Sequence, residues 1–172
     1  MDLDIGVLTD GGLLFLWVIN SQMQLGLECM SKWGFLSLIE YDAVRVVADR
    51  ANSTLTSLPS HEKIVWVKKT GYDRILVGPG HYVLHSSEIC LIGVKNTKGR
   101  RAQYIPKVSN DVIFAAIRKR SQKPEQMYEI IERMVPGGRK LEIFGRNHCI
   151  RPSWLTIGNQ YVPAQTHTAQ PL

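Results

Sequence analysis

Apolar positions along the chain form short continuous runs separated by polar and glycine-rich segments. The clearest run, Leu13–Ile19, lies between Gly11-Gly12 and Asn20-Ser21. Its length and unbroken apolar character are typical of a strand buried on both faces. Similar runs predict further strands at 64–67, 89–94, 112–115 and 141–145.

Two segments between these runs repeat apolar residues at helical spacing. The first is expected to be capped by Ser21 and ended by Gly34, and the second to begin at Pro124 and end at Pro136-Gly137-Gly138. Their apolar faces comprise Met23, Leu27, Met30 and Trp33 in the first, and Met127, Ile131 and Met134 in the second. Strands that alternate with helices predict an α/β domain with a mainly parallel sheet and helices on both faces.

The chain length and local composition predict one domain with an irregular insert. The 172 residues suit a single domain, which we place at residues 1–160. Residues 36–62 have weak patterns and a Ser/Thr-rich stretch at 52–60, so we expect an insertion or a long surface loop there. Residues 161–172 are expected to be a disordered tail.

Basic residues are concentrated in one half of the chain. The whole sequence has a formal charge of +6. Residues 1–94 hold 7 basic and 10 acidic side chains, a charge of −3, whereas residues 95–151 hold 14 basic and 5 acidic ones, a charge of +9. This asymmetry favours a polyanionic partner, with a solvated basic surface as the alternative.

Composition and cysteine placement narrow the class of protein. With 44% hydrophobic and 21% charged residues, the chain has a globular composition, which excludes a collagen-like repeat and a coiled coil. Cys29, Cys90 and Cys149 show neither CxxC nor Cys/His ligand spacing, so we expect no disulfide framework and no metal site. The longest apolar run is too short to span a bilayer, and no membrane association is expected.

The residues most suggestive of chemistry lie in the last third of the chain. Lys123-Pro124 opens the second helix, Phe144-Gly145-Arg146 closes a strand that contains Glu142, and Asn159-Gln160 follows. A strand that ends in a glycine turn, with a carboxylate inside it and a lysine at a nearby helix start, can bind a charged nucleoside-type cofactor. Each of these short strings is weak evidence by itself.

Taken together and in order, a set of segments resembles the eukaryotic N6-adenosine methyltransferase family. The resemblance covers about residues 8–35 and 63–160, is most specific over 121–160, and is closest to the catalytic, S-adenosylmethionine-binding subunits that act on messenger RNA. The segments that carry it are Gly12–Val18, Trp33–Phe35, Val65–Lys68, Glu88–Lys95, Asp111–Ile113, Lys123-Pro124, Ile130–Arg133, Glu142–Arg146 and Trp154–Gln160.

The resemblance implies a fold, a reaction and partners. The fold would be a permuted, Rossmann-like class I methyltransferase fold, in which the cofactor-binding motif follows the catalytic motif along the chain. The cofactor would be S-adenosylmethionine, and the reaction methyl transfer to the exocyclic amine of adenosine in mRNA. The enzyme would act in the nucleus as a heterodimer with a noncatalytic methyltransferase-like subunit. Adenine in DNA is the alternative substrate.

The resemblance also implies two groups of site residues. In the cofactor group, Lys123 would lie near the methionine carboxylate, Glu142 would take a ribose hydroxyl, and His148 would lie at the methionine end. The remaining cofactor-binding residues are Arg146, Asn147, Asn159 and Gln160. The group that would bind RNA, gate the target adenosine or face the partner comprises Arg74, His81, Tyr82, His85, Glu88, Arg118, Lys119 and Arg120.

Two departures from the family pattern accompany the resemblance. Cys149 replaces the usual asparagine, and a thiol is a poor substitute for an amide in hydrogen bonding. The family's Asp-Pro-Pro-Trp motif, which engages the adenine amine, is absent from these 172 residues, whose eight prolines are all isolated. We therefore assign no catalytic residue and expect the domain to be incomplete at its N-terminal end. A noncatalytic RNA-binding scaffold and an inactive fragment are the alternatives.

Overall fold

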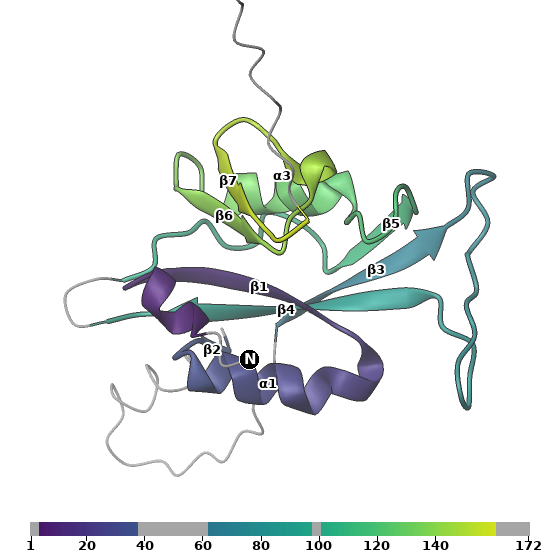
Figure 1. Cartoon of the computed structure of the whole chain (residues 1–172), viewed down its shortest axis with the longest axis horizontal. Coiled ribbons are helices and arrows are strands. Elements are labelled where there is room, and N and C mark those ends of the chain that lie inside the picture. Colours follow the sequence, from purple (N-terminus) through teal and green to yellow (C-terminus); the bar gives the residue numbers. More distant parts are fainter. Residues whose placement is uncertain (1–3, 38–61, 98–100, 161–172) are drawn as a thin grey trace, which may run out of the picture.

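A mixed β-sheet forms the centre of the computed structural model, which describes residues 4–37, 62–97 and 101–160 (Figure 1). The strands follow the order β1-β4-β3-β5, and the two-residue β2 also pairs with β4. Their bounds are β1 Gly12–Val18, β2 Leu36–Ser37, β3 Lys63–Lys69, β4 Ser87–Lys95 and β5 Val112–Ala116. The four predicted strands in this part of the chain are therefore present, each with slightly different ends.

The expectation of a mainly parallel sheet is wrong. β4 pairs antiparallel with β1, β2 and β3, and only β3 and β5 form a parallel pair within this sheet. The reason lies in the connection between β3 and β4, residues 70–86, which contains no helix. A parallel pair needs a crossover connection, usually a helix, whereas a simple loop returns the chain antiparallel.

Helices cover both faces of the sheet, as expected. α1, Met23–Lys32, lies on one face and α3, Glu125–Met134, on the other (Figure 1). Side chains of β1 pack on both faces of the sheet, because successive side chains of a strand point to opposite faces. Leu14, Leu16 and Val18 pack in the cluster that contains α1, while Leu13, Phe15 and Trp17 pack with the cluster that contains α3.

β1 occupies an edge of this sheet among the described strands. It bonds β4 along one side, and no described strand pairs with its other side. Accordingly only Val18 is buried, and the residues from Gly12 to Trp17 are half-buried. Both faces of β1 are thus covered by helix layers, as predicted. However, β1 has a described neighbouring strand on one side only, so it is less buried than an inner strand.

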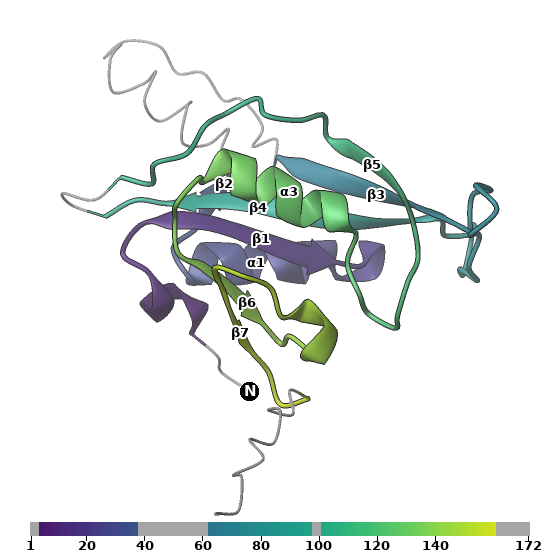
Figure 2. The ribbon, with the colours of Figure 1, turned by 90° about the horizontal axis from the view of Figure 1, so that it is seen from above.

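A second, two-stranded parallel sheet lies on the α3 side of the main sheet (Figures 1 and 2). It consists of β6, Lys140–Ile143, and β7, Trp154–Ile157, joined by a connection that includes the 3-10 helix η3, Asn147–Cys149. The backbones that follow β6 and β7 approach each other closely at Gly145 and Gly158. A Cβ at Gly158 would lie only 2.2 Å from the Gly145 carbonyl oxygen. Phe144 has φ of 62°, a left-handed conformation uncommon for an aromatic residue.

Local boundary signals are partly confirmed. Gly34 ends the first helix with φ of +79° and Gly137 follows the second with φ of +70°, as their positions predicted. The expected cap is wrong: Ser21 belongs to a 3-10 turn, and Gln22 precedes α1 without a side-chain cap. The proposed insertion falls mostly, and the proposed tail entirely, outside the described residues. No described helix is long and apolar enough to cross a membrane.

Candidate functional site

One face of the sheet presents charged and aromatic side chains at the end nearest the start of α3. β1 and β3 run in the same direction and β4 runs antiparallel between them. Trp66 of β3 is paired directly with Glu88 of β4, and Lys68 follows two residues later on the same face. Trp17 of β1 meets Trp66 edge to face, with ring centroids 6.1 Å apart.

Lys123 completes this group from the loop that precedes α3. Its Nζ donates to Glu88 Oε2 at 2.5 Å and lies 4.6 Å from the ring centroid of Trp17. Lys68 Nζ pairs with the other oxygen, Oε1, at 2.7 Å. We call Lys68, Glu88, Lys123 and Trp17 the lysine–glutamate cluster. Its two cations and one anion leave a net positive charge, which suits an anionic group of a ligand.

The cluster keeps the Glu88 carboxylate ionised. Burial alone would raise the pKa of Glu88, but hydrogen bonds and ion pairs with Lys123 and Lys68 outweigh it and hold the pKa below its ordinary value. A carboxylate with a lowered pKa is a weak base. Glu88 can therefore accept a hydrogen bond from a ligand more readily than it can remove a proton.

The loop between β5 and α3 connects this cluster to the second sheet. Arg118 Nη2 donates to the carbonyl oxygen of Lys123 at 2.8 Å, and Arg146 Nη1 donates to the carbonyl oxygen of Arg120 at 3.2 Å. Lys119 bonds through its backbone to the Gln122 side chain. The structure thus brings Arg146 to the loop that holds Arg120 and Lys123, although Arg146 and Arg120 are 26 positions apart.

Glu142 is held by a tyrosine of α3. The hydroxyl of Tyr128 lies 3.1 Å from both carboxylate oxygens of Glu142. Tyr128 is buried, and burial first and the Glu142 charge second raise the pKa of its hydroxyl. Cys149 is also buried, and its thiol pKa is raised mainly by burial. Cys149 therefore contributes to packing beneath Glu142 rather than presenting its side chain to a ligand.

The other predicted cofactor residues surround the ends of β6 and β7. Arg146 and Gln160 extend the pairing of the two strands by one parallel bridge, and Asn159 and Gln160 are exposed. Asn147 and His148 lie in η3. The Nε2 atom of His148 is buried and has no hydrogen-bond partner among the described residues. The unpaired nitrogen of His148 and the exposed amide side chains of Asn159 and Gln160, at the end of a parallel strand pair, fit a nucleoside-type ligand.

Four residues predicted to bind RNA or a partner lie away from this region. Arg74, His81, Tyr82 and His85 belong to the β3–β4 connection, which projects from the body in both views (Figures 1 and 2). Tyr82 is 93% exposed, and its ring meets that of His81 edge to face, with centroids 4.6 Å apart. Gly78 and His85 exchange backbone hydrogen bonds, which hold this connection as a β-bridge.

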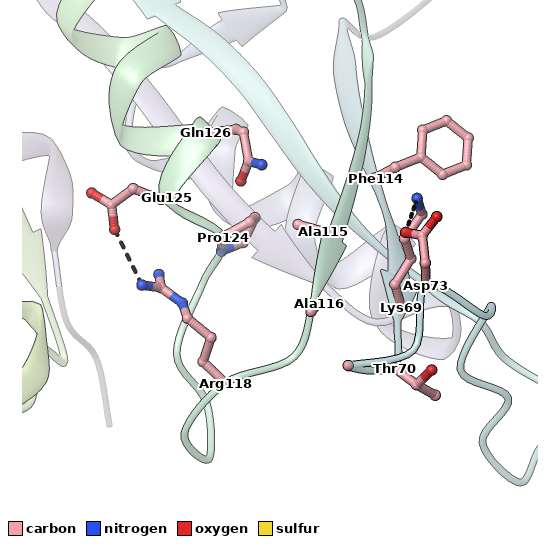
Figure 3. Close-up of a pocket in the computed structure, with 11 residues that line it drawn as sticks. Lys69, Thr70, Asp73, Phe114, Ala115, Ala116, Arg118, Pro124, Glu125 and Gln126 are labelled. Atoms are coloured by element: carbon pink, nitrogen blue, oxygen red, sulfur yellow. Dashed lines mark hydrogen bonds and ion pairs between the residues drawn. The ribbon is translucent and has the colours of Figure 1, made fainter.

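A pocket of about 410 Å³ lies beside the loop, between the ends of β3 and β5 and the start of α3 (Figure 3). Its charged lining is already paired: Lys69 with Asp73 at 2.6 Å, and Arg118 with Glu125 at 3.3 Å. None of the predicted cofactor residues lines it. The pocket therefore lacks the excess positive charge of the lysine–glutamate cluster, where we place the site.

Two interacting residues escaped the sequence reasoning. Glu125 accepts hydrogen bonds from both terminal nitrogens of Arg151, and the Arg151 guanidinium carbon lies 3.5 Å from the ring centroid of Tyr128. Glu125 and Arg151 are 26 positions apart, so no local pattern could link them. The same applies to Trp17, which sequence patterning assigns only to the core.

Comparisons with known proteins agree on one family. A family model described as MT-A70 matches residues 56–160. The chain is 41% identical over 160 residues to the N(6)-adenosine-methyltransferase subunit METTL3 of Danio rerio and 40% identical over 160 residues to the N(6)-adenosine-methyltransferase catalytic subunit METTL3 of Homo sapiens. It is also 29% identical over 169 residues to the N(6)-adenosine-methyltransferase non-catalytic subunit METTL14 of Drosophila melanogaster.

These matches cover most of this chain but a small part of each relative. The aligned region is 92% of this chain in all three cases. It is 23% of the Danio rerio and Homo sapiens proteins and 36% of the Drosophila melanogaster protein. The chain thus spans about a quarter of the length of these two METTL3 proteins.

Proposed function

Because the chain belongs to the MT-A70 family, we propose that it binds S-adenosylmethionine and serves in methyl transfer to the exocyclic amine of adenosine in mRNA. We further propose that it acts in the nucleus, as a subunit of a heterodimer with a noncatalytic methyltransferase-like protein. The names of its relatives support a methyltransferase with catalytic and non-catalytic subunits. DNA adenine is the alternative substrate.

The observation that carries the proposal is the ion pair between Lys123 and Glu88. Lys123 belongs to the group predicted to bind the cofactor, and Glu88 to the group predicted to bind RNA, gate the target adenosine or face the partner. Their side chains meet at 2.5 Å, although they are 35 positions apart. A single cluster that carries both a cation for the donor and a carboxylate for the acceptor could hold the two reactants of a methyl transfer close together, which favours the reaction.

The described residues can hold the two ends of the cofactor. A carboxylate group would take hydrogen bonds from the Lys123 ammonium, which has three donors and uses one on Glu88. Ribose hydroxyls would bond Glu142, Asn159 and Gln160. The exposed ring of Phe144, set between Glu142 and Arg146 in sequence, offers an apolar surface to adenine. These positions are consistent with a Rossmann-like arrangement of β6 and β7, in which ligands bind beyond the carboxyl ends of strands.

Glu88 would orient the target base. S-adenosylmethionine, when bound, supplies an electrophilic methyl group. The exocyclic amine of adenine is a poor nucleophile, so its orientation matters more than general-base strength. Because Lys68 and Lys123 hold the pKa of Glu88 low, its carboxylate would accept an N–H hydrogen bond without removing the proton. We assign Glu88 to positioning of the amine.

Exposed basic and aromatic residues supply surfaces for RNA and for a partner. Lys119 and Arg120 are exposed beside the cluster and would contact phosphates. The projecting connection carries large exposed side chains, including Tyr82, Val83 and Leu84 at 93%, 69% and 68% exposure. Apolar and aromatic groups of this kind favour contact with a partner subunit or an unpaired base.

A noncatalytic role is the second candidate, because the sequence contains no Asp-Pro-Pro-Trp motif. In that case the chain would bind RNA or support a complex without transferring methyl groups. Methyl transfer to an adenosine-containing RNA separates the two roles. It is measured with the chain plus a noncatalytic relative, and with a catalytic relative in the presence and absence of the chain. Product in the first mixture supports the enzyme, whereas an increase by the chain of the product made by the catalytic relative, with none in the first mixture, supports the scaffold.

Calorimetric titration with S-adenosylmethionine tests the cofactor assignment directly. We expect saturable binding by the folded chain and weaker binding by Lys123→Ala. Folding is verified by circular dichroism, which also detects any loss of structure in the variant. A folded chain that binds no S-adenosylmethionine would overturn the proposed function.

A further inference from the structure

The carboxylate of Glu125 connects the two ends of the proposed cofactor site. Glu125 is the first residue of α3, and two arginines converge on it. Arg118 Nη1 lies 3.3 Å from Oε2, and Arg151 donates to both oxygens, with Nη2 at 2.9 Å from Oε2. A bidentate arginine–carboxylate pair fixes both distance and orientation, because the guanidinium and carboxylate groups are planar.

At one end, Arg118 joins Glu125 to Lys123. One nitrogen of the guanidinium bonds Glu125, and the other donates to the Lys123 carbonyl oxygen at 2.8 Å. The backbone of Lys123 is therefore tied to the start of α3, independently of its ammonium group. This geometry gives Arg118 two contacts within the chain, to Glu125 and to the backbone of Lys123.

At the other end, Arg151 joins Glu125 to Glu142 through Tyr128. The guanidinium of Arg151 lies on the ring of Tyr128, 3.5 Å from its centroid. The hydroxyl of that tyrosine lies 3.1 Å from both oxygens of Glu142. Tyr128 is 6% exposed, so it has little freedom to move without moving Glu142.

We propose that Glu125 is a positioning residue, which through Arg118 and through Arg151 with Tyr128 holds Lys123 and Glu142 in a fixed relation for one ligand with a carboxylate at one end and a ribose at the other. The inference rests on the proposed function, because S-adenosylmethionine is the ligand with those two ends. A site held in advance loses less conformational freedom on binding, which increases affinity. Glu125 itself need not touch the ligand.

A comparison of two ligands tests the carboxylate end and the ribose end of the site separately. S-adenosylmethionine has both the carboxylate and the ribose, whereas 5′-methylthioadenosine keeps the ribose and lacks the amino-acid carboxylate. Calorimetric affinities are measured for both ligands with the full chain. Arg118→Ala should weaken S-adenosylmethionine about tenfold, the effect of one charge-assisted hydrogen bond, and leave 5′-methylthioadenosine within about twofold. Tyr128→Phe should weaken both ligands by a similar factor.

Glu125→Gln should combine the two effects, because it removes the charge that both arginines share. It should weaken both ligands, and S-adenosylmethionine more than 5′-methylthioadenosine. Arg118→Lys keeps the charge and one donor, and should restore part of the affinity lost in Arg118→Ala. Glu129→Gln is the matched control, because Glu129 is exposed on the same helix one turn later.

The outcomes distinguish this inference from the proposed function. A wild-type chain that binds neither ligand removes the proposed function and this inference with it. A wild-type chain that binds both, with Arg118→Ala weakening the two ligands equally, leaves the proposed function in place and overturns the positioning role. Equal affinities for wild type and Glu125→Gln overturn it as well. Loss of the circular dichroism spectrum in Glu125→Gln shifts the decision to Arg118→Ala and Arg118→Lys, which alter no residue of α3.

Discussion

Replacing Glu88 by glutamine should destabilise the fold, because it removes the one anion that separates two lysines. The side chains of Lys68, Glu88 and Lys123 are 26%, 25% and 24% exposed. Their ion pairs therefore lie between surface pairs, worth about 0–1 kcal/mol, and buried pairs, whose disruption costs about 3–5 kcal/mol. We expect Glu88→Gln to lower the free energy of unfolding by about 1–3 kcal/mol, or the Tm by about 3–9 °C.

The pH dependence of this effect has a definite sign. Burial would raise the pKa of Glu88, but Lys123 and Lys68 together hold it below the ordinary value of 4.5. A carboxyl group whose pKa is lowered by folding contributes stability above its unfolded pKa, and that contribution is lost as the pH falls through the folded value. The difference between wild type and Glu88→Gln should be full at pH 7 and should shrink below pH 4.5.

Thermal unfolding of wild type and Glu88→Gln, followed by circular dichroism at neutral pH and at about pH 3, measures the Tm decrease and its dependence on pH. Glu129→Gln controls for loss of a carboxylate elsewhere, since Glu129 is exposed on α3. Two results would refute the reasoning. One is a Tm change at neutral pH no larger than that of the control, and the other is a change of the same size at both pH values.

Three further predictions concern binding. Lys123→Ala and Asn159→Ala should each weaken S-adenosylmethionine about tenfold with the circular dichroism spectrum retained, and unchanged affinity in both would remove the cofactor assignment. Reversing Lys119 and Arg120 to glutamate should weaken RNA binding and reduce its dependence on salt, measured by fluorescence anisotropy; an unchanged salt slope would exclude them as phosphate contacts. Leu84→Ser should leave the Tm of the chain unchanged, because Leu84 is 68% exposed, and should weaken co-purification with the noncatalytic partner; undiminished co-purification would place the interface elsewhere.

Individual elements were predictable from the sequence because their signals are local. The apolar run of β1, the glycine after α1 and the Pro-Gly-Gly stop after α3 all act within a few residues of where they occur. Strand direction was not predictable in the same way, because it depends on the length and content of connections. The segment between β3 and β4 looked like an ordinary long loop, but the antiparallel pairing of the two strands and the bridge between Gly78 and His85 show that the chain folds back as a hairpin.

In the candidate site, too, individual residues were predictable from the sequence and their long-range contacts were not. Lys123, Glu142 and Arg146 stand next to turns and helix starts, and the family resemblance marks them. The contacts within the site, in contrast, join segments that are far apart in the chain. Glu88 pairs with Lys123, and Glu125 pairs with Arg151. Pairs at such separations become visible only when sheet register and helix packing are known, so the roles inferred for Glu125 and Arg151 required the structure.

The antiparallel direction of β4, which contradicts the predicted parallel sheet, also determines where the site lies. Glu88 stands at the beginning of β4, and Lys68 near the end of β3. In a parallel sheet, the beginning of β4 would lie beside the beginning of β3, and Glu88 would be about 15 Å from Lys68 at about 3.3 Å per residue. The antiparallel register instead pairs Glu88 with Trp66 and brings its carboxylate to 2.7 Å from Lys68. Reversal of β4 therefore brings the carboxylate into the lysine–glutamate cluster.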